Sequence, residues 1–149
     1  AVAKIEAPEI VLLHENEKGI YGDKAERCLD LIGNIKLENF GAIFDPANFV
    51  QVGQRPFSEC FSQLKPYIKY MHIKDAMLAD GKVVPAGEGD GEVPQILAAL
   101  SQTGFNGFLS LEPHLTVAAK SHGFTGPERF GTAISALKGI IDEIRIDYN

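Results

Sequence analysis

The run YIKYMHI, residues 67–73, is the stretch that decides the fold of this chain. It is short, apolar and rich in β-forming residues, as expected for a strand that is buried on both faces of a sheet. Three further runs of the same kind are EIVLLHE at 9–15, GAIFD at 41–45 and GFLSLE at 107–112. We therefore predict four strands.

Helical patterns alternate with these strands. Apolar residues recur at helical spacing over residues 25–35, 57–64, 93–100 and 127–146, which is typical of helices with one buried face. The alternating order predicts an α/β fold in which helical crossovers join parallel strands. Four such units are half of an eight-unit barrel of about 250 residues. A doubly wound open sheet is the alternative, although no G-x-G-x-x-G follows the first strand.

Each predicted strand ends in, or next to, a side chain that can bind a metal ion, and these are Glu15, Asp45, His72 and Glu112. The carboxyl ends of parallel strands converge on one face of a barrel, so these side chains are expected to share one space. Alone, each acid is more often a helix cap, and the histidine is as often a core residue. Together they predict a site for Mn²⁺, Mg²⁺, Co²⁺ or Zn²⁺, because a divalent cation offsets the repulsion among three carboxylates.

Five segments, in this order, resemble the C-terminal half of the xylose isomerase-like TIM-barrel superfamily. That family includes ketose 3-epimerases, hydroxypyruvate isomerases, inosose isomerases and dehydratases, and endonuclease IV. The resemblance implies one domain over residues 1–149 that forms βα units 5–8 of a TIM barrel and holds one divalent metal on the four residues above. The segments are LLHENEKGIYGD (12–23), FDPANFV (44–50), YMHIKDA (70–76), VPAGEGDGEVP (84–94) and GFLSLEPHL (107–115).

The resemblance also implies an isomerase, an epimerase or a dehydratase that acts on a keto-sugar or keto-polyol. In such enzymes the metal stabilises an enediolate, and two metal-bound glutamates, here Glu15 and Glu112, exchange the proton on carbon. The alternative is a non-catalytic half-barrel fragment that keeps the ligands but lacks a complete pocket. The endonuclease IV branch is disfavoured, because the chain has only four histidines and a net charge of -6.

Three residues are predicted to contact the substrate: Glu17, Asn48 and Lys74. Asn48 stands where many 3-epimerases have the histidine of Asp-x-x-His, and Lys74 is the cation nearest to the place of their arginine. Both departures argue against 3-epimerase activity on a free ketose. An exposed surface lysine is the alternative for Lys74, and simple loop solvation is the alternative for Glu17.

Three further residues are predicted to support the site. Asp75 is expected to orient His72. His114 shares the strand parity of Glu112 and is expected to lie behind it. Glu88, in the glycine-rich stretch AGEGDG, is expected to anchor a loop over the site, or else to be a solvated carboxylate.

The composition is that of a globular protein, with 45% apolar and 23% charged residues. Its acidity argues against a nucleic-acid partner, and no run of about 20 apolar residues predicts a membrane helix. Cys28 and Cys60 are expected to be buried free thiols, which fits a cytoplasmic location. A half-barrel exposes two sheet edges. We therefore expect either a homo-oligomer or a missing N-terminal half-barrel, and the resemblance implies a small sugar or polyol as the substrate.

Overall fold

The computed structural model describes residues 9–115 and 126–145, and its main sheet contains the four predicted strands. All neighbouring pairs are parallel, in the order β1-β2-β3-β6. The fold prediction is therefore confirmed: four parallel strands alternate with helices. The strands are β1 (Leu12–Glu15), β2 (Phe40–Phe44), β3 (Ile68–Ile73) and β6 (Phe108–Leu111).

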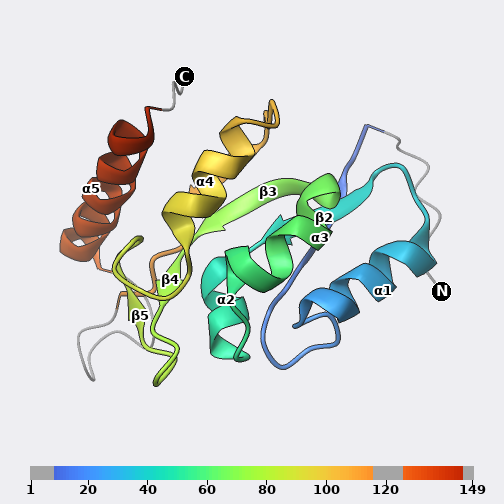
Figure 1. The fold of residues 1–149 in the computed structure, drawn as a ribbon, viewed down its shortest axis with the longest axis horizontal. Helices are drawn as coiled ribbons and strands as arrows, with labels where there is room; N and C mark the ends of the chain where they lie inside the picture. The colour runs from blue at the N-terminus through green and yellow to red at the C-terminus, as the bar shows by residue number, and fades with distance from the viewer. Residues whose placement is uncertain (1–8, 116–125, 146–149) are drawn as a thin grey trace.

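The helices lie on one side of this sheet, and α5 lies beside α4 (Figure 1). Three of the four predicted helices appear close to their expected bounds as α1, α4 and α5. The single α-helix expected over residues 57–64 is instead a π-helix, η1, followed by a short α3 and a 3-10 turn, η2. The elements are α1 (Ala25–Ile35), α2 (Pro46–Gln51), η1 (Pro56–Phe61), α3 (Ser62–Leu64), η2 (Lys65–Tyr67), α4 (Val93–Ser101) and α5 (Pro127–Ile144).

The start of η1 depends on Glu92, a residue distant in the sequence. Its carboxylate accepts hydrogen bonds from the backbone N–H groups of Phe57 and Ser58 at 2.8 and 3.1 Å and from the Ser58 hydroxyl at 2.5 Å. These N–H groups lie in the first turn of a helix and have no partner within it. The predicted apolar spacing was correct here, but periodicity carries no information about a cap that comes from another element.

A second sheet is a short antiparallel pair of β4 (Asp75–Ala76) and β5 (Val83–Val84). It continues the chain directly after β3 and leads into the glycine-rich stretch. Neither strand was predicted, because two residues are too few to show a period.

The core lies between the helices and one face of the main sheet. Along β3, Met71 and Ile73 are 0% and 1% exposed, whereas Tyr70 and His72 point to the opposite face. The largest buried apolar side chains include Phe44 and Phe49 from the second strand–helix unit and Ile96 and Leu97 from α4.

The opposite face of the sheet is open, so the expectation that the strands are buried on both faces is wrong for the described residues. Phe108 is 74% exposed, and each of β1 and β6 pairs with only one neighbour. In a complete barrel this face is filled by side chains from all eight strands. Four strands cannot fill it, which explains the exposed aromatic ring.

The expectation for the two cysteines is confirmed. Cys28 and Cys60 are both free and buried, and burial raises the pKa of each thiol to about 12. Within residues 9–115 and 126–145, no helix is long and apolar enough to cross a membrane.

Candidate metal centre

Side chains from all four strands meet at the carboxyl end of the main sheet. Glu15 is the last residue of β1, Asp45 and Glu112 directly follow β2 and β6, and His72 lies near the end of β3. His72 Nδ1 is 3.1 Å from Glu15 Oε1, 3.6 Å from Asp45 Oδ2 and 3.3 Å from Glu112 Oε2. One potential ligand atom from each residue lies within 4.8 Å of the others. The expected convergence is therefore present.

Asp45 serves two purposes at once. Its Oδ1 accepts the backbone N–H of Asn48 at 2.9 Å and so caps the first turn of α2, while its Oδ2 faces His72. Asn16 fixes the Asp45 backbone through two hydrogen bonds: Asn16 Nδ2 donates to Asp45 O at 2.9 Å, and Asp45 N donates to Asn16 Oδ1 at 2.8 Å. The helix-cap reading and the ligand reading of Asp45 are thus compatible.

Lys74 is buried in the centre, unlike an ordinary surface lysine. Its side chain is 4% exposed, and its ammonium group lies 3.1 Å from each of Asp45 Oδ2, Asn48 Oδ1 and Glu112 Oε2. The surface-lysine alternative is therefore wrong. Lys74 follows β3 with the same parity as His72, which places both cationic side chains on the open face of the sheet.

Asn48 connects the two sides of the centre. Its Nδ2 donates to Glu15 Oε1 at 3.1 Å and to Glu17 Oε2 at 3.5 Å, while its Oδ1 accepts from Lys74. The residue is 0% exposed. Glu17 is half-buried at the border of the site. The substrate contacts expected of both residues remain predictions.

The predicted role of Asp75 is corrected by the structure. Its carboxylate does not orient His72 but accepts four backbone N–H groups, from Ala76, Gly87, Gly89 and Gly91, at 2.7 to 3.1 Å. A β-carbon at Gly89 or Gly91 would collide with this carboxylate. The two glycines are therefore required by close approach of the loop to Asp75.

Glu88 is not the anchor of that loop, because its side chain is exposed and makes no hydrogen bond or ion pair with the described residues. Asp75 has that role instead. His114 Nε2 is 3.4 Å from Glu112 Oε1, and its supporting role stays a prediction. Its backbone has a φ of 40°, in the left-handed region, which is uncommon for a residue other than glycine.

The charges of the centre are mutually compensated. Burial lowers the pKa of His72, but hydrogen bonds to Asp45, Glu112 and Glu15 outweigh burial and raise this pKa to about 11. The hydrogen bond from His72, helped by the charge of Lys74 and opposed by burial, lowers the pKa of Glu112 to about 2. Burial likewise lowers the pKa of Lys74, but the charges of Asp45 and Glu112 raise it overall. Without a metal, an imidazolium and an ammonium therefore face the carboxylates.

This pairing predicts acid sensitivity. The pKa of Glu112 is about 2 in the folded protein, below the ordinary value of 4.5. A group of this kind stabilises the fold fully above its ordinary pKa, and the contribution is lost as the pH falls through the folded pKa. In urea unfolding of the metal-free protein we expect wild type to be more stable than Glu112→Gln at pH 6 and the difference to shrink progressively as the pH falls from about 5 towards 2. A difference that stays constant over this range would contradict the pairing.

The donor set fits a divalent cation. Three carboxylates and one imidazole present their atoms to one another at short range, and like charges at this separation require compensation. Oxygen-rich ligands with one nitrogen suit Mg²⁺, Mn²⁺, Co²⁺ or Zn²⁺ and lack the thiolates of a structural zinc site.

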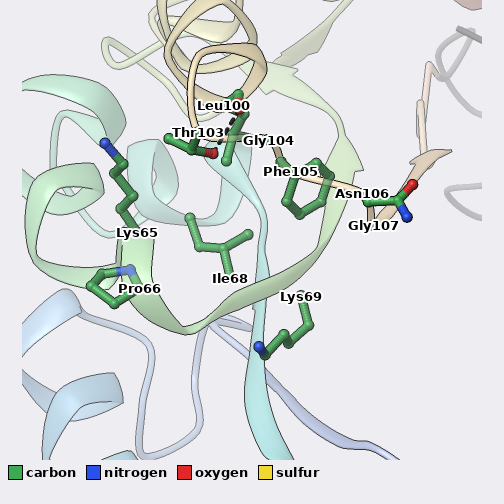
Figure 2. A pocket seen from close by; sticks show the side chains of 10 residues that line it. All are labelled: Lys65, Pro66, Ile68, Lys69, Leu100, Thr103, Gly104, Phe105, Asn106 and Gly107. Atoms are coloured by element: carbon green, nitrogen blue, oxygen red, sulfur yellow. Dashed lines mark hydrogen bonds between the residues drawn. The ribbon is translucent and has the colours of Figure 1, made fainter.

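A separate groove of about 680 Å³ lies at the other end of the strands. Figure 2 shows it between the start of β3, at Ile68 and Lys69, and the segment Thr103–Gly107 that precedes β6. In parallel α/β sheets ligands bind at the carboxyl ends of the strands. The groove is at the amino ends and contains none of the four clustered side chains, so we do not assign it to the substrate.

Comparisons with known proteins agree with this architecture. Residues 1–140 match the family described as "Xylose isomerase-like TIM barrel". No curated protein matches the sequence.

Solved structures show the same fold. A D-tagatose 3-epimerase-like protein matches with a TM-score of 0.67 and 21% identity, over 88% of this chain and 46% of that chain. The probable 3-DHS dehydratase AsbF of Bacillus anthracis, involved in petrobactin synthesis, matches with a TM-score of 0.66 and 21% identity, over 87% and 48%. A xylose isomerase-like TIM barrel protein from Mycobacterium smegmatis in complex with magnesium matches with a TM-score of 0.66 and 19% identity, over 91% and 44%. The chain thus spans about half the length of the structures it matches.

Proposed function

This chain belongs to the xylose isomerase-like TIM barrel family, and we propose that it supplies the divalent-metal site and the proton-transfer residues of an enzyme that isomerises, epimerises or dehydrates a keto-sugar or keto-polyol. One observation carries the proposal: four strand ends bring Glu15, Asp45, His72 and Glu112 within 4.8 Å of one another. The magnesium in one similar structure, and the epimerase-like and dehydratase descriptions of two others, support it.

In this proposal the four clustered residues hold one divalent cation, which when bound would polarise the substrate carbonyl and favour loss of the neighbouring proton. Glu15 and Glu112 come from opposite edges of the sheet, so they can face a bound substrate from two sides. One carboxylate accepts the proton on carbon and the other returns it. Return to the opposite face inverts a stereocentre, return to the adjacent carbon exchanges aldose and ketose, and loss of a β-hydroxyl gives dehydration.

The remaining polar side chains would orient the substrate. Asn48 and Glu17 lie next to Glu15, and Lys74 lies next to Glu112. A hydroxyl group can exchange hydrogen bonds with an amide, and a developing oxyanion is stabilised by a nearby ammonium. His114 would limit the orientations of Glu112 through its contact with Oε1.

The pocket proposed here needs a second half-barrel. β1 and β6 each have an unpaired edge among the described residues, and Phe108 is 74% exposed on the open face. The similar structures are about twice as long as this chain. Either an N-terminal half-barrel or a second copy of the chain would pair with these edges and cover the open face.

A titration with Mn²⁺ and a turnover assay test this function. We expect the chain to bind about one Mn²⁺ per copy in calorimetry. With the open face covered by a second half-barrel, we expect a panel of ketoses and keto-polyols to show turnover that chelator abolishes and Mn²⁺ restores. Binding without turnover in a complete eight-strand form would favour the non-catalytic half-barrel. Absence of Mn²⁺ binding would refute the metal centre.

A further inference from the structure

The ammonium group of Lys74 contacts the same oxygen atoms that the proposed metal would use. Asp45 Oδ2 lies 3.1 Å from Lys74 Nζ and 3.6 Å from His72 Nδ1. Glu112 Oε2 lies 3.1 Å from Lys74 Nζ and 3.3 Å from His72 Nδ1. A fixed positive charge thus lies directly beside the place where the four potential ligand atoms converge.

This position is built into the fold. Lys74 is 4% exposed, and the third partner of its ammonium group is Asn48 Oδ1, at 3.1 Å. A lysine ammonium has three N–H donors, and here it has three acceptors. Protein oxygen atoms can thus accept from all three donors, and the group is held beside Asp45 and Glu112.

Asp45 does not need Lys74 to stay in place. Its Oδ1 accepts the Asn48 backbone N–H at 2.9 Å, and Asn16 holds its backbone from the other side. Removal of the ammonium would therefore leave this ligand oriented. What would change most is the electrostatic potential, because a divalent ion and an ammonium a few ångströms apart repel each other strongly.

We propose that Lys74 is a resident cation of the metal centre, which neutralises Asp45 and Glu112 before a divalent ion binds and weakens the binding of that ion. The inference rests on the proposed function. The three carboxylates carry three negative charges, which a divalent ion and the Lys74 ammonium together balance when His72 is neutral. The complete centre is then neutral rather than anionic, and the ammonium stays beside Glu112, where a substrate oxygen gains negative charge during proton transfer.

The inference predicts that metal affinity and turnover change in opposite directions. In the full chain, Lys74→Met should bind Mn²⁺ at least about tenfold more tightly, because the repulsion is gone. Its kcat should fall at saturating Mn²⁺, because the charge that stabilises the substrate oxygen is gone. Lys69→Met is the matched control: Lys69 is an exposed residue of the same strand, and both its Kd for Mn²⁺ and its kcat should equal those of wild type.

Calorimetry with Mn²⁺ alone separates the possible failures. If wild type binds no Mn²⁺, the metal centre itself is refuted. If wild type binds Mn²⁺ and Lys74→Met binds it equally or more weakly, only the resident-cation inference is overturned.

Lys74→Gln, which keeps hydrogen-bond donors but no charge, is the second variant. Should either variant be unfolded without metal, circular dichroism must show that Mn²⁺ restores its fold, because the ion replaces the missing positive charge. Both variants remaining unfolded in saturating Mn²⁺ would also overturn the inference.

Discussion

Replacement of Glu112 by glutamine is expected to lower kcat by roughly a thousandfold, within the range that positioned acids and bases contribute. The amide has nearly the same shape as the carboxylate and keeps one oxygen for the metal and Lys74. It cannot accept a proton, however, whereas the low pKa of Glu112, about 2, keeps the wild-type side chain ionised. Steady-state kinetics at saturating Mn²⁺ on the substrate found in the ketose panel would measure the loss.

Two measurements make this result specific. Glu38→Gln, at an exposed glutamate in the loop between α1 and β2, should retain the wild-type kcat. Mn²⁺ titration of Glu112→Gln must show a saturated site under the assay conditions, so that lost chemistry is not confused with lost metal. A Glu112→Gln protein that is metal-loaded and keeps more than about a tenth of the wild-type kcat would show that Glu112 transfers no proton.

Replacement of Asp75 by alanine is expected to cause the largest loss of stability, roughly 3 kcal/mol in the free energy of unfolding. The change removes the acceptor of four backbone N–H groups, those of Ala76, Gly87, Gly89 and Gly91. Burial raises the pKa of Asp75, although these four hydrogen bonds oppose that rise. The wild-type carboxylate is therefore itself costly to bury, and this keeps the expected loss below the sum of four broken hydrogen bonds.

Urea denaturation monitored by circular dichroism would measure the loss as a lower midpoint at an unchanged m-value. Asp80→Ala is the matched control, because Asp80 is exposed and accepts one backbone N–H, from Lys82 at 2.9 Å. It should cost less than about 1 kcal/mol. Equal midpoints for the two variants would contradict the role of Asp75 as the anchor of the glycine-rich loop.

The same change should also affect the metal centre. Asp75 directly follows Lys74, whose ammonium contacts Asp45 and Glu112. If the glycine-rich loop separates from residue 75, the backbone at Lys74 loses its support and the Lys74 ammonium group is held less firmly. The loop anchor and the metal centre therefore depend on adjacent residues, Asp75 and Lys74.

Local sequence patterns were sufficient to predict those structural features whose physical cause is local or repeats along the chain. Four short apolar runs predicted four strands, and their alternation with helical spacing predicted parallel pairing. Side chains alternate along a strand, and the carboxyl ends of parallel strands lie together, so the sequence alone predicts that Glu15, Asp45, His72 and Glu112 share one space.

Those patterns could not predict hydrogen bonds between residues that lie far apart in the sequence. The expectation for Asp75 failed because its four N–H donors lie up to 16 residues further along the chain, in a loop whose path no periodicity describes. Glu92 reaches η1 from 35 residues away, and Asn16 reaches Asp45 from 29 residues away. Each was an ordinary polar residue in the sequence.

The sequence by itself determined the order of the four main strands and of α1, α4 and α5, the parallel sheet and the four residues that face one another at its end. These features follow from the spacing of apolar side chains along the sequence. They also follow from the alternation of strands and helices, which brings successive strands next to one another in a parallel sheet. Only the tertiary structure decided which charges meet: that Lys74 is buried between Asp45 and Glu112, and that Asp75 holds the glycine-rich loop. Ion pairs and buried hydrogen bonds act over about 3 Å, and distances of that size between remote residues are fixed by packing.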